Sequence, residues 1–117
     1  MIKACFTKKN GKYTSLSITG HANTDEFGKD LVCAEASAIA FGTCNALNEL
    51  TNNENINISK NKIDIQINDE SEMENIILDV CRIQLATIEY SHPTAIEIKI
   101  TEEWENEICI NRSILCE

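Results

Sequence analysis

The sequence predicts an α+β fold: a mixed or antiparallel sheet with two helices packed on one of its faces. Apolar and polar residues alternate in several short stretches, which is the period of a half-buried strand. Two longer stretches have helical patterns and separate the paired strand patterns. The resulting order, ββαββαβ, is typical of helices that cover one face of a sheet.

The first two strand patterns, over 2–7 and 13–19, are predicted to form a β-hairpin. Asn10 and Gly11 lie between them, and both residue types tolerate the positive φ that a tight hairpin turn requires. This hairpin delivers His21 to the end of its second strand.

A long helix is predicted to begin with Asp30 as its N-cap and to run through alanine-rich sequence to about Leu50. Gly42 lies within this helix, where glycine lowers helix stability by about 1 kcal/mol relative to alanine. Close contact with a neighbouring element would be a reason for glycine at this position. Cys44 lies about three turns after Cys33, on the same side of the helix, and is expected in the core.

A second hairpin and a second helix follow. Alternating isoleucines on both sides of 59–62 predict the hairpin. Ser71 and Glu74 have the spacing of a capping box for a helix that ends near Tyr90. The apolar face of this helix is assigned to Met73, Ile76, Ile77, Val80 and Ile83.

A last strand over 95–101 completes a single domain, residues 1–101. The remaining segment, 102–117, is a C-terminal extension of a different character, acidic at first and then apolar around two cysteines. An added β-ribbon, a dimer arm and a disordered tail all fit this pattern.

Composition limits the class of partner and the compartment. The 117 residues suit one domain with a modest core. No apolar run reaches the roughly 18–20 residues that cross a bilayer, and the N-terminus does not have the pattern of a signal peptide. We therefore expect a cytoplasmic protein without a membrane partner. The net charge of −9 disfavours direct binding of nucleic acid and favours a basic partner, although solubility alone would also explain it.

The six cysteines are expected to be free thiols, because a reducing cytosol disfavours disulfides. If any pair forms, Cys109 and Cys116 are the best placed, since they close a short loop. No metal site is expected, because neither a Cys-x-x-Cys nor a His-x-x-x-His pattern occurs.

His21 and Cys33 are the candidate catalytic pair. The loop between them, 22–32, has eleven residues, whereas strand-to-helix connections usually have about 2–6. With Asp30 as N-cap, Cys33 would occupy the first helical turn, where the helix dipole favours a thiolate. An adjacent histidine could act as base and then as acid toward a leaving amine. A packing role for Cys33 and a structural role for His21 remain open from the spacing alone.

A longer pattern contains these two residues. Gly20-His21-Ala22, the run from Glu26 to Ala34, Ala36-Ser37-Ala38 and Phe41-Gly42 together resemble the signature of the ribosomal-processing cysteine protease family, Prp. The resemblance implies a bacterial, homodimeric, cofactor-free endopeptidase. Its implied substrate is a basic large-subunit ribosomal protein (the twenty-seventh of the L series), from which it removes a short N-terminal extension.

The resemblance also implies roles for individual residues. Cys33 matches the nucleophile, His21 its partner, and Asp30 and Ser37 match positions close to the site. The loop that covers the substrate in the family is matched by Ala22, Asn23, Thr24, Asp25, Glu26, Phe27, Gly28 and Lys29. Glu35 departs from the family pattern, where a small residue is expected, and the extension 102–117 exceeds the usual length.

Two other functions fit parts of the sequence. A non-catalytic ribosome-assembly module would bind the same partner without cutting it, but would have no chemical reason to keep both His21 and Cys33. A thiol redox protein would form sulfenic acid or a disulfide at Cys33, although no resolving cysteine is near it in sequence.

Overall fold

The computed structural model describes residues 1–20 and 29–104. The element order is β1 (Ile2–Lys9), β2 (Lys12–Thr19), α1 (Lys29–Leu50), β3 (Ile56–Ser59), β4 (Lys62–Gln66), α2 (Glu72–Ser91) and β5 (Ile96–Glu103). This confirms the predicted ββαββαβ order. The helix α1 begins before Asp30, so Asp30 lies within the helix and is not its N-cap. The predicted loop 22–32 is correspondingly shorter, because its last four residues are helical.

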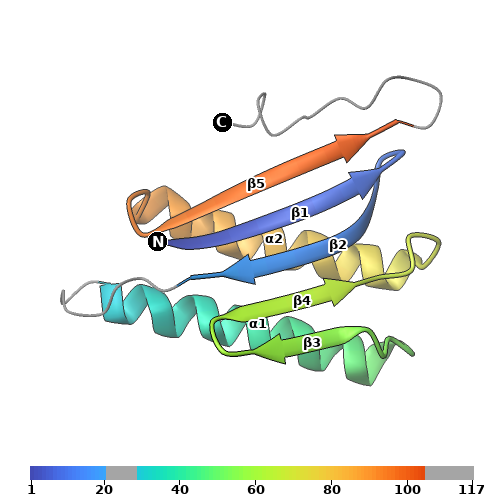
Figure 1. Ribbon diagram of the computed structural model, residues 1–117, viewed down its shortest axis with the longest axis horizontal. Helices are drawn as coiled ribbons and strands as arrows, with labels where there is room; N and C mark the ends of the chain where they lie inside the picture. The colour runs from blue at the N-terminus through green and yellow to red at the C-terminus, as the bar shows by residue number, and fades with distance from the viewer. Residues whose placement is uncertain (21–28, 105–117) are drawn as a thin grey trace.

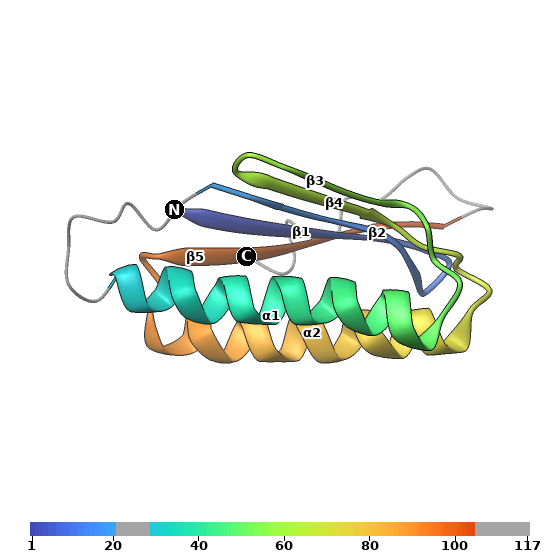
Figure 2. The same ribbon diagram turned by 90° about the horizontal axis from the view of Figure 1, so that it is seen from below.

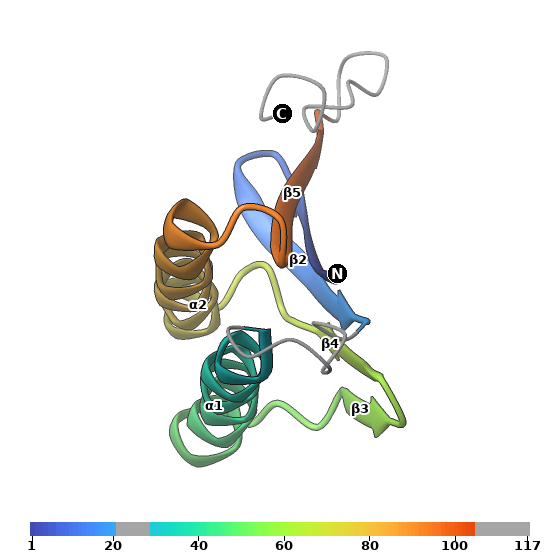
Figure 3. The ribbon, with the colours of Figure 1, turned by 90° about the vertical axis from the view of Figure 1, so that its left-hand side faces the viewer.

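The five strands form one sheet in the order β3-β4-β2-β1-β5 (Figure 1). All neighbours are antiparallel except β1 and β5, which are parallel, so the sheet is mixed. Both helices lie on the same side of the sheet (Figure 2). Figure 3 shows α1 beside the β3–β4 end of the sheet and α2 beside the β5 end. The predicted fold class is therefore confirmed.

The core lies between the sheet and the helices. Buried and exposed side chains alternate along β1, and the buried ones form part of the core. Ile2, Ala4 and Phe6 of β1 are buried, whereas Lys3 and Cys5 between them are exposed on the open face. The first turn has the predicted geometry, since φ is +52° at Asn10 and +81° at Gly11. The helices contribute apolar residues that are all buried: Val32, Ala36, Ala40, Cys44, Leu47, Ile77, Leu78, Cys81, Leu85 and Ile88. The predicted core position of Cys44 is thus confirmed.

The apolar face predicted for α2 is wrong in all but one residue. Ile77 is buried, but Met73, Ile76, Val80 and Ile83 are about half exposed. The helix carries apolar residues on two sides, and the side with Leu78, Cys81 and Leu85 faces the sheet. Gly42 of α1 is also exposed, and a Cβ added there would meet nothing within 4 Å among residues 1–20 and 29–104, so the expected close contact is not found there.

The cap of α2 differs in part from the capping box. The amide of Glu74 donates to Ser71 Oγ at 3.2 Å, as predicted. The Glu74 carboxylate is buried and accepts hydrogen bonds from Asn53 Nδ2 at 2.7 Å and from the amide of Asn68 at 3.2 Å. It therefore holds together the loops that precede β3 and α2.

A hydrogen-bonded network at Tyr13 fixes the first hairpin to α2. The Tyr13 hydroxyl donates to Asp79 Oδ1 at 2.6 Å and accepts from Arg82 Nε at 2.9 Å. The Tyr13 amide donates to Asn75 Oδ1 at 2.7 Å. Burial, followed by the hydrogen bond to Asp79, raises the pKa of Tyr13 from 10.0 to about 12.

This pKa shift predicts a loss of stability in alkali. A phenol whose pKa is higher in the folded state than in the unfolded state stabilises the fold below pH 10, and this contribution is lost as the pH rises through about 12. We expect the unfolding free energy of the wild type, measured by urea denaturation, to fall more steeply between pH 10 and 12 than that of Tyr13→Phe. Parallel curves for the two proteins would contradict this assignment.

No helix within the described residues is long and apolar enough to span a membrane.

Candidate active site

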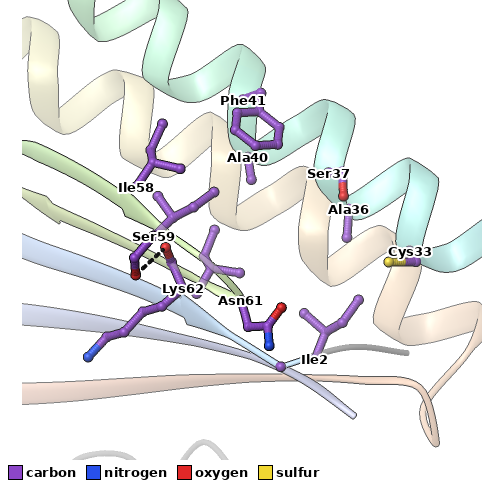
Figure 4. Close-up of a pocket in the computed structure, with 13 residues that line it drawn as sticks. Ile2, Cys33, Ala36, Ser37, Ala40, Phe41, Ile58, Ser59, Asn61 and Lys62 are labelled. Carbon is purple, nitrogen blue, oxygen red and sulfur yellow. Dashed lines mark hydrogen bonds between the residues drawn. The ribbon is translucent and has the colours of Figure 1, made fainter. Parts of the chain in front are cut away.

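Cys33 lies at one end of a pocket between α1 and the tip of the β3–β4 hairpin. The pocket has a volume of about 230 Å³. Cys33 is half-buried and packs against the core, and its side chain lines the pocket together with residues further along α1 (Figure 4). The lining residues are Ile2, Ile18, Gly20, Cys33, Ala36, Ser37, Ala40, Phe41, Ile58, Ser59, Asn61, Lys62 and Ile63. A thiol in an open, mostly apolar pocket of this size can reach a bound side chain or a short peptide segment.

The position of Cys33 in α1 differs from the predicted one. Because the helix begins at Lys29, Cys33 is its fifth residue and not the third after an N-cap. The first four amides of a helix lack intrahelical partners, so the amide of Cys33 lies just beyond them. The thiol remains within about one turn of the positive end of the helix dipole, where the dipole still acts.

His21 and the loop residues 22–28 lie outside the described residues. The residue immediately before His21, Gly20, is described, and it lines the same pocket as Cys33. Gly20 has φ +89°, and its amide donates to the carbonyl of Asn61 at 3.2 Å. A Cβ at this position would lie 2.4 Å from the carbonyl oxygen of Met1. Gly20 is therefore held at a fixed point in the pocket wall, directly before His21 in the sequence.

The other described residues that were predicted near the site all lie in α1. Ser37, one turn after Cys33, is exposed and lines the pocket. Lys29 and Asp30 begin α1, and the structure describes only their backbone. Glu35 is exposed and is not among the pocket residues.

The hairpin side of the pocket was not predicted from the sequence. Ile58, Asn61 and Lys62 are about 25 residues or more from Cys33 in the chain and reach it only through the sheet order. Ile58 is an exposed apolar residue on an edge strand, and this exposure is the feature that points to it as a pocket residue. The exposure is known only from the tertiary structure, so the sequence alone could not reveal it.

Metal binding and disulfide formation are the other kinds of chemistry that cysteine and acidic side chains can support. Within residues 1–20 and 29–104, no group of histidine, cysteine and acidic side chains is arranged to hold a metal ion. Cys5, Cys33, Cys44 and Cys81 are free thiols, and Cys109 and Cys116 lie outside the described residues. Burial raises the pKa of the Cys44 and Cys81 thiols, which makes both poor nucleophiles.

The chain is similar in sequence to known cysteine proteases. Residues 1–97 match the sequence model of a family described as Cysteine protease Prp. The ribosomal processing cysteine protease Prp of Staphylococcus aureus is 40% identical over 86 residues, which cover 68% of this chain and 78% of that protein. The protein of the same name from Bacillus subtilis is 46% identical over 48 residues, or 40% of this chain and 43% of that one.

Solved structures agree with these sequence matches. A crystal structure of the S. aureus protease, in complex with a covalently linked product peptide, has a TM-score of 0.78 at 32% identity, covering 86% of this chain and 99% of that one. A second structure of that protease holds a substrate peptide. SMU.848 from Streptococcus mutans shares the fold, with a TM-score of 0.76 at 24% identity over 87% of this chain and 95% of that one.

Proposed function

Since the chain belongs to the cysteine protease Prp family and is therefore a cysteine protease, we propose that it removes the N-terminal extension of a basic large-subunit ribosomal protein during ribosome maturation. The observation that carries this proposal is the pocket itself, because Cys33 and the residue preceding His21 line one cavity. The S. aureus relative is a ribosomal processing cysteine protease by name, which supports the proposal, as does the net charge of −9, which suits a basic substrate. We place the reaction in the bacterial cytoplasm.

The proposed mechanism uses Cys33 and His21. His21 takes the proton of the Cys33 thiol, and the thiolate attacks the scissile carbonyl carbon, forming an S–C bond. The C–N bond then breaks, and His21 returns the proton to the leaving amine. Water, deprotonated by His21, hydrolyses the thioester and regenerates the thiol. Asp30 and Ser37 have supporting roles in this proposal, and residues 22–29 contact the substrate.

The test is incubation with the N-terminal peptide of the ribosomal protein, read by mass spectrometry. Cleavage at one bond supports the proposal. Tight binding without cleavage would favour the alternative, a non-catalytic ribosome-assembly module, and the exposed Glu35 and the extension 102–117 would then be the first segments to exchange.

Replacing His21 with alanine is expected to lower the cleavage rate by about 10²- to 10⁴-fold, because the reaction loses its general base and acid. The same change should slow alkylation of Cys33 by iodoacetamide at neutral pH, since less thiolate would be present. Unchanged alkylation would mean that the helix dipole, and not His21, activates the thiol. His92, which caps the C-terminus of α2, provides the matched histidine control.

We further propose that the enzyme is a homodimer, joined through the outer face of its helices. Met73, Ile76, Val80 and Ile83 form a half-exposed apolar stripe on α2. Beside it, Ala38, Gly42 and Ala46 of α1 line a groove of about 600 Å³ between the helices. An apolar stripe on one helix can pack on its own copy about a twofold axis, and this face is opposite the sheet-facing side of α1 that lines the pocket.

The change Ile76→Lys tests this interface. A charge in the middle of the stripe should convert the dimer to a monomer in analytical ultracentrifugation, because a lysine cannot be buried there unpaired. Asn52→Lys, which adds the same charge to an exposed loop, should leave the mass unchanged. A wild type that sediments as a monomer would contradict the proposal.

A further inference from the structure

The strand β3 leaves one row of its backbone groups without a neighbouring strand. The amide of Gln66 donates to the carbonyl of Asn55 at 3.0 Å, next to the β3–β4 ladder. Hydrogen-bonded pairs alternate with non-hydrogen-bonded pairs in an antiparallel ladder, so the register directs Asn57 and Ser59 toward β4. The amides and carbonyls of Ile56 and Ile58 therefore point away from the sheet. Within the described part of the chain, β3 is an edge strand and no hydrogen bond to these groups occurs.

The opposite edge of the sheet differs in this respect. On β5, the amide of Ile98 donates to Glu89 Oε2 of α2 at 2.9 Å, so one outward group of that strand is already occupied. Unpaired strand edges invite added strands, and proteins commonly block them. Among the described residues, β3 is thus the edge strand on which no outward backbone group is shown to have a partner.

The open edge of β3 is continuous with the pocket of Cys33. The side chain of Ile58 is 54% exposed and lines the pocket with Phe41, which is 46% exposed. Figure 4 shows these two side chains at one end of the pocket and Cys33 at the other. Phe41 follows Cys33 by eight residues on α1, a rise of about 12 Å, which an extended peptide spans with about four residues.

We propose that the substrate peptide binds as an additional strand on β3. In this arrangement the outward amide and carbonyl of Ile58 form hydrogen bonds with the main chain of the peptide. The peptide residue opposite Ile58 directs its side chain to the same face, so a large apolar side chain about four residues from the scissile bond contacts Ile58 and Phe41. The inference rests on the proposed protease function and names the form in which the substrate is bound.

The substitution Ile58→Pro tests the backbone contact. Proline removes the outward amide but leaves the ladder bonds of Asn57 and Ser59, and edge strands tolerate proline where the amide faces outward. We expect kcat/KM for the peptide to fall about fivefold to tenfold or more, mainly through KM, which corresponds to the loss of one main-chain hydrogen bond. Ile58→Ala keeps the amide and separates the contribution of the side chain: it should weaken binding of peptides with a large apolar residue more than that of peptides with alanine there.

A scan of the substrate with N-methylated peptides tests the same contact on the wild-type enzyme. Because alternate residues of an added strand bond to its neighbour, cleavage should fall at every second methylated position around the one opposite Ile58. If Ile58→Pro does not fold, this scan still tests whether the peptide binds as an added strand on β3. Efficient cleavage of all methylated peptides, or full activity of folded Ile58→Pro, would overturn strand addition while the protease function stands. Failure of the wild type to cleave the unmodified peptide would instead overturn the proposed function and this inference with it.

Discussion

Replacing Cys33 with alanine is expected to abolish peptide cleavage while the protein remains folded. Without the thiol no thioester can form, and loss of a nucleophile commonly costs more than about 10³-fold in rate. Alanine suits the helix and removes only one half-buried sulfur atom, so the thermal unfolding temperature should change little.

The matched control is Cys5→Ala. Cys5 is exposed on the open face of β1, away from the pocket, and this variant should cleave at the wild-type rate. If Cys33→Ala cleaved the peptide as fast as the wild type, Cys33 would not be the nucleophile.

The second large effect is expected for Gly20→Ala. A non-glycine residue at φ +89° is strained, and the added Cβ would lie 2.4 Å from the carbonyl oxygen of Met1. Either the start of β1 or the chain leading to His21 must move. We expect urea denaturation to show that the unfolding free energy falls by roughly 2 kcal/mol or more, of which about 1–2 kcal/mol comes from the strained φ. The cleavage rate should fall as well.

Gly42→Ala provides the contrasting glycine. Nothing among the described residues of the same chain lies within 4 Å of a Cβ at this helical position, so in the monomeric Ile76→Lys background alanine should raise the unfolding free energy by about 0.5–1 kcal/mol. If Gly20→Ala were as stable and as active as the wild type, the close approach of Gly20 to Met1 would not constrain the site.

Much of the fold was predictable because local patterns agree with the tertiary structure. Alternation placed Ile2, Ala4 and Phe6 on the buried face, and Asn10-Gly11 marked the turn. The face of α2 was not predictable in this way, since apolar residues occur on two sides of the helix. Periodicity shows that such a helix has apolar stripes, but only packing decides which one faces the sheet.

Of the residues that line the pocket, those on the helix side could be predicted from the sequence and those on the hairpin side could not. A long polar loop between a strand end and an alanine-rich helix predicted His21 and Cys33 as a pair, and the resemblance to a known family supported the same two residues. The start of α1 was misplaced because aspartate favours both the N-cap and the first turn of a helix, so Asp30 fits either position. The hairpin residues Ile58 and Asn61 could not be found from the sequence, because their contact with the pocket arises from strand order.

The most direct test of the central claim is to trap the enzyme with a substrate-derived peptide that carries a thiol-reactive group at the scissile position. Intact mass spectrometry followed by peptide mapping identifies the modified residue. The proposed mechanism predicts one peptide adduct per chain, located on Cys33, with exposed Cys5 unmodified at the same reagent concentration. An adduct on Cys5 or another cysteine, or no adduct at all from a peptide that binds, would contradict the assignment of Cys33 as the nucleophile.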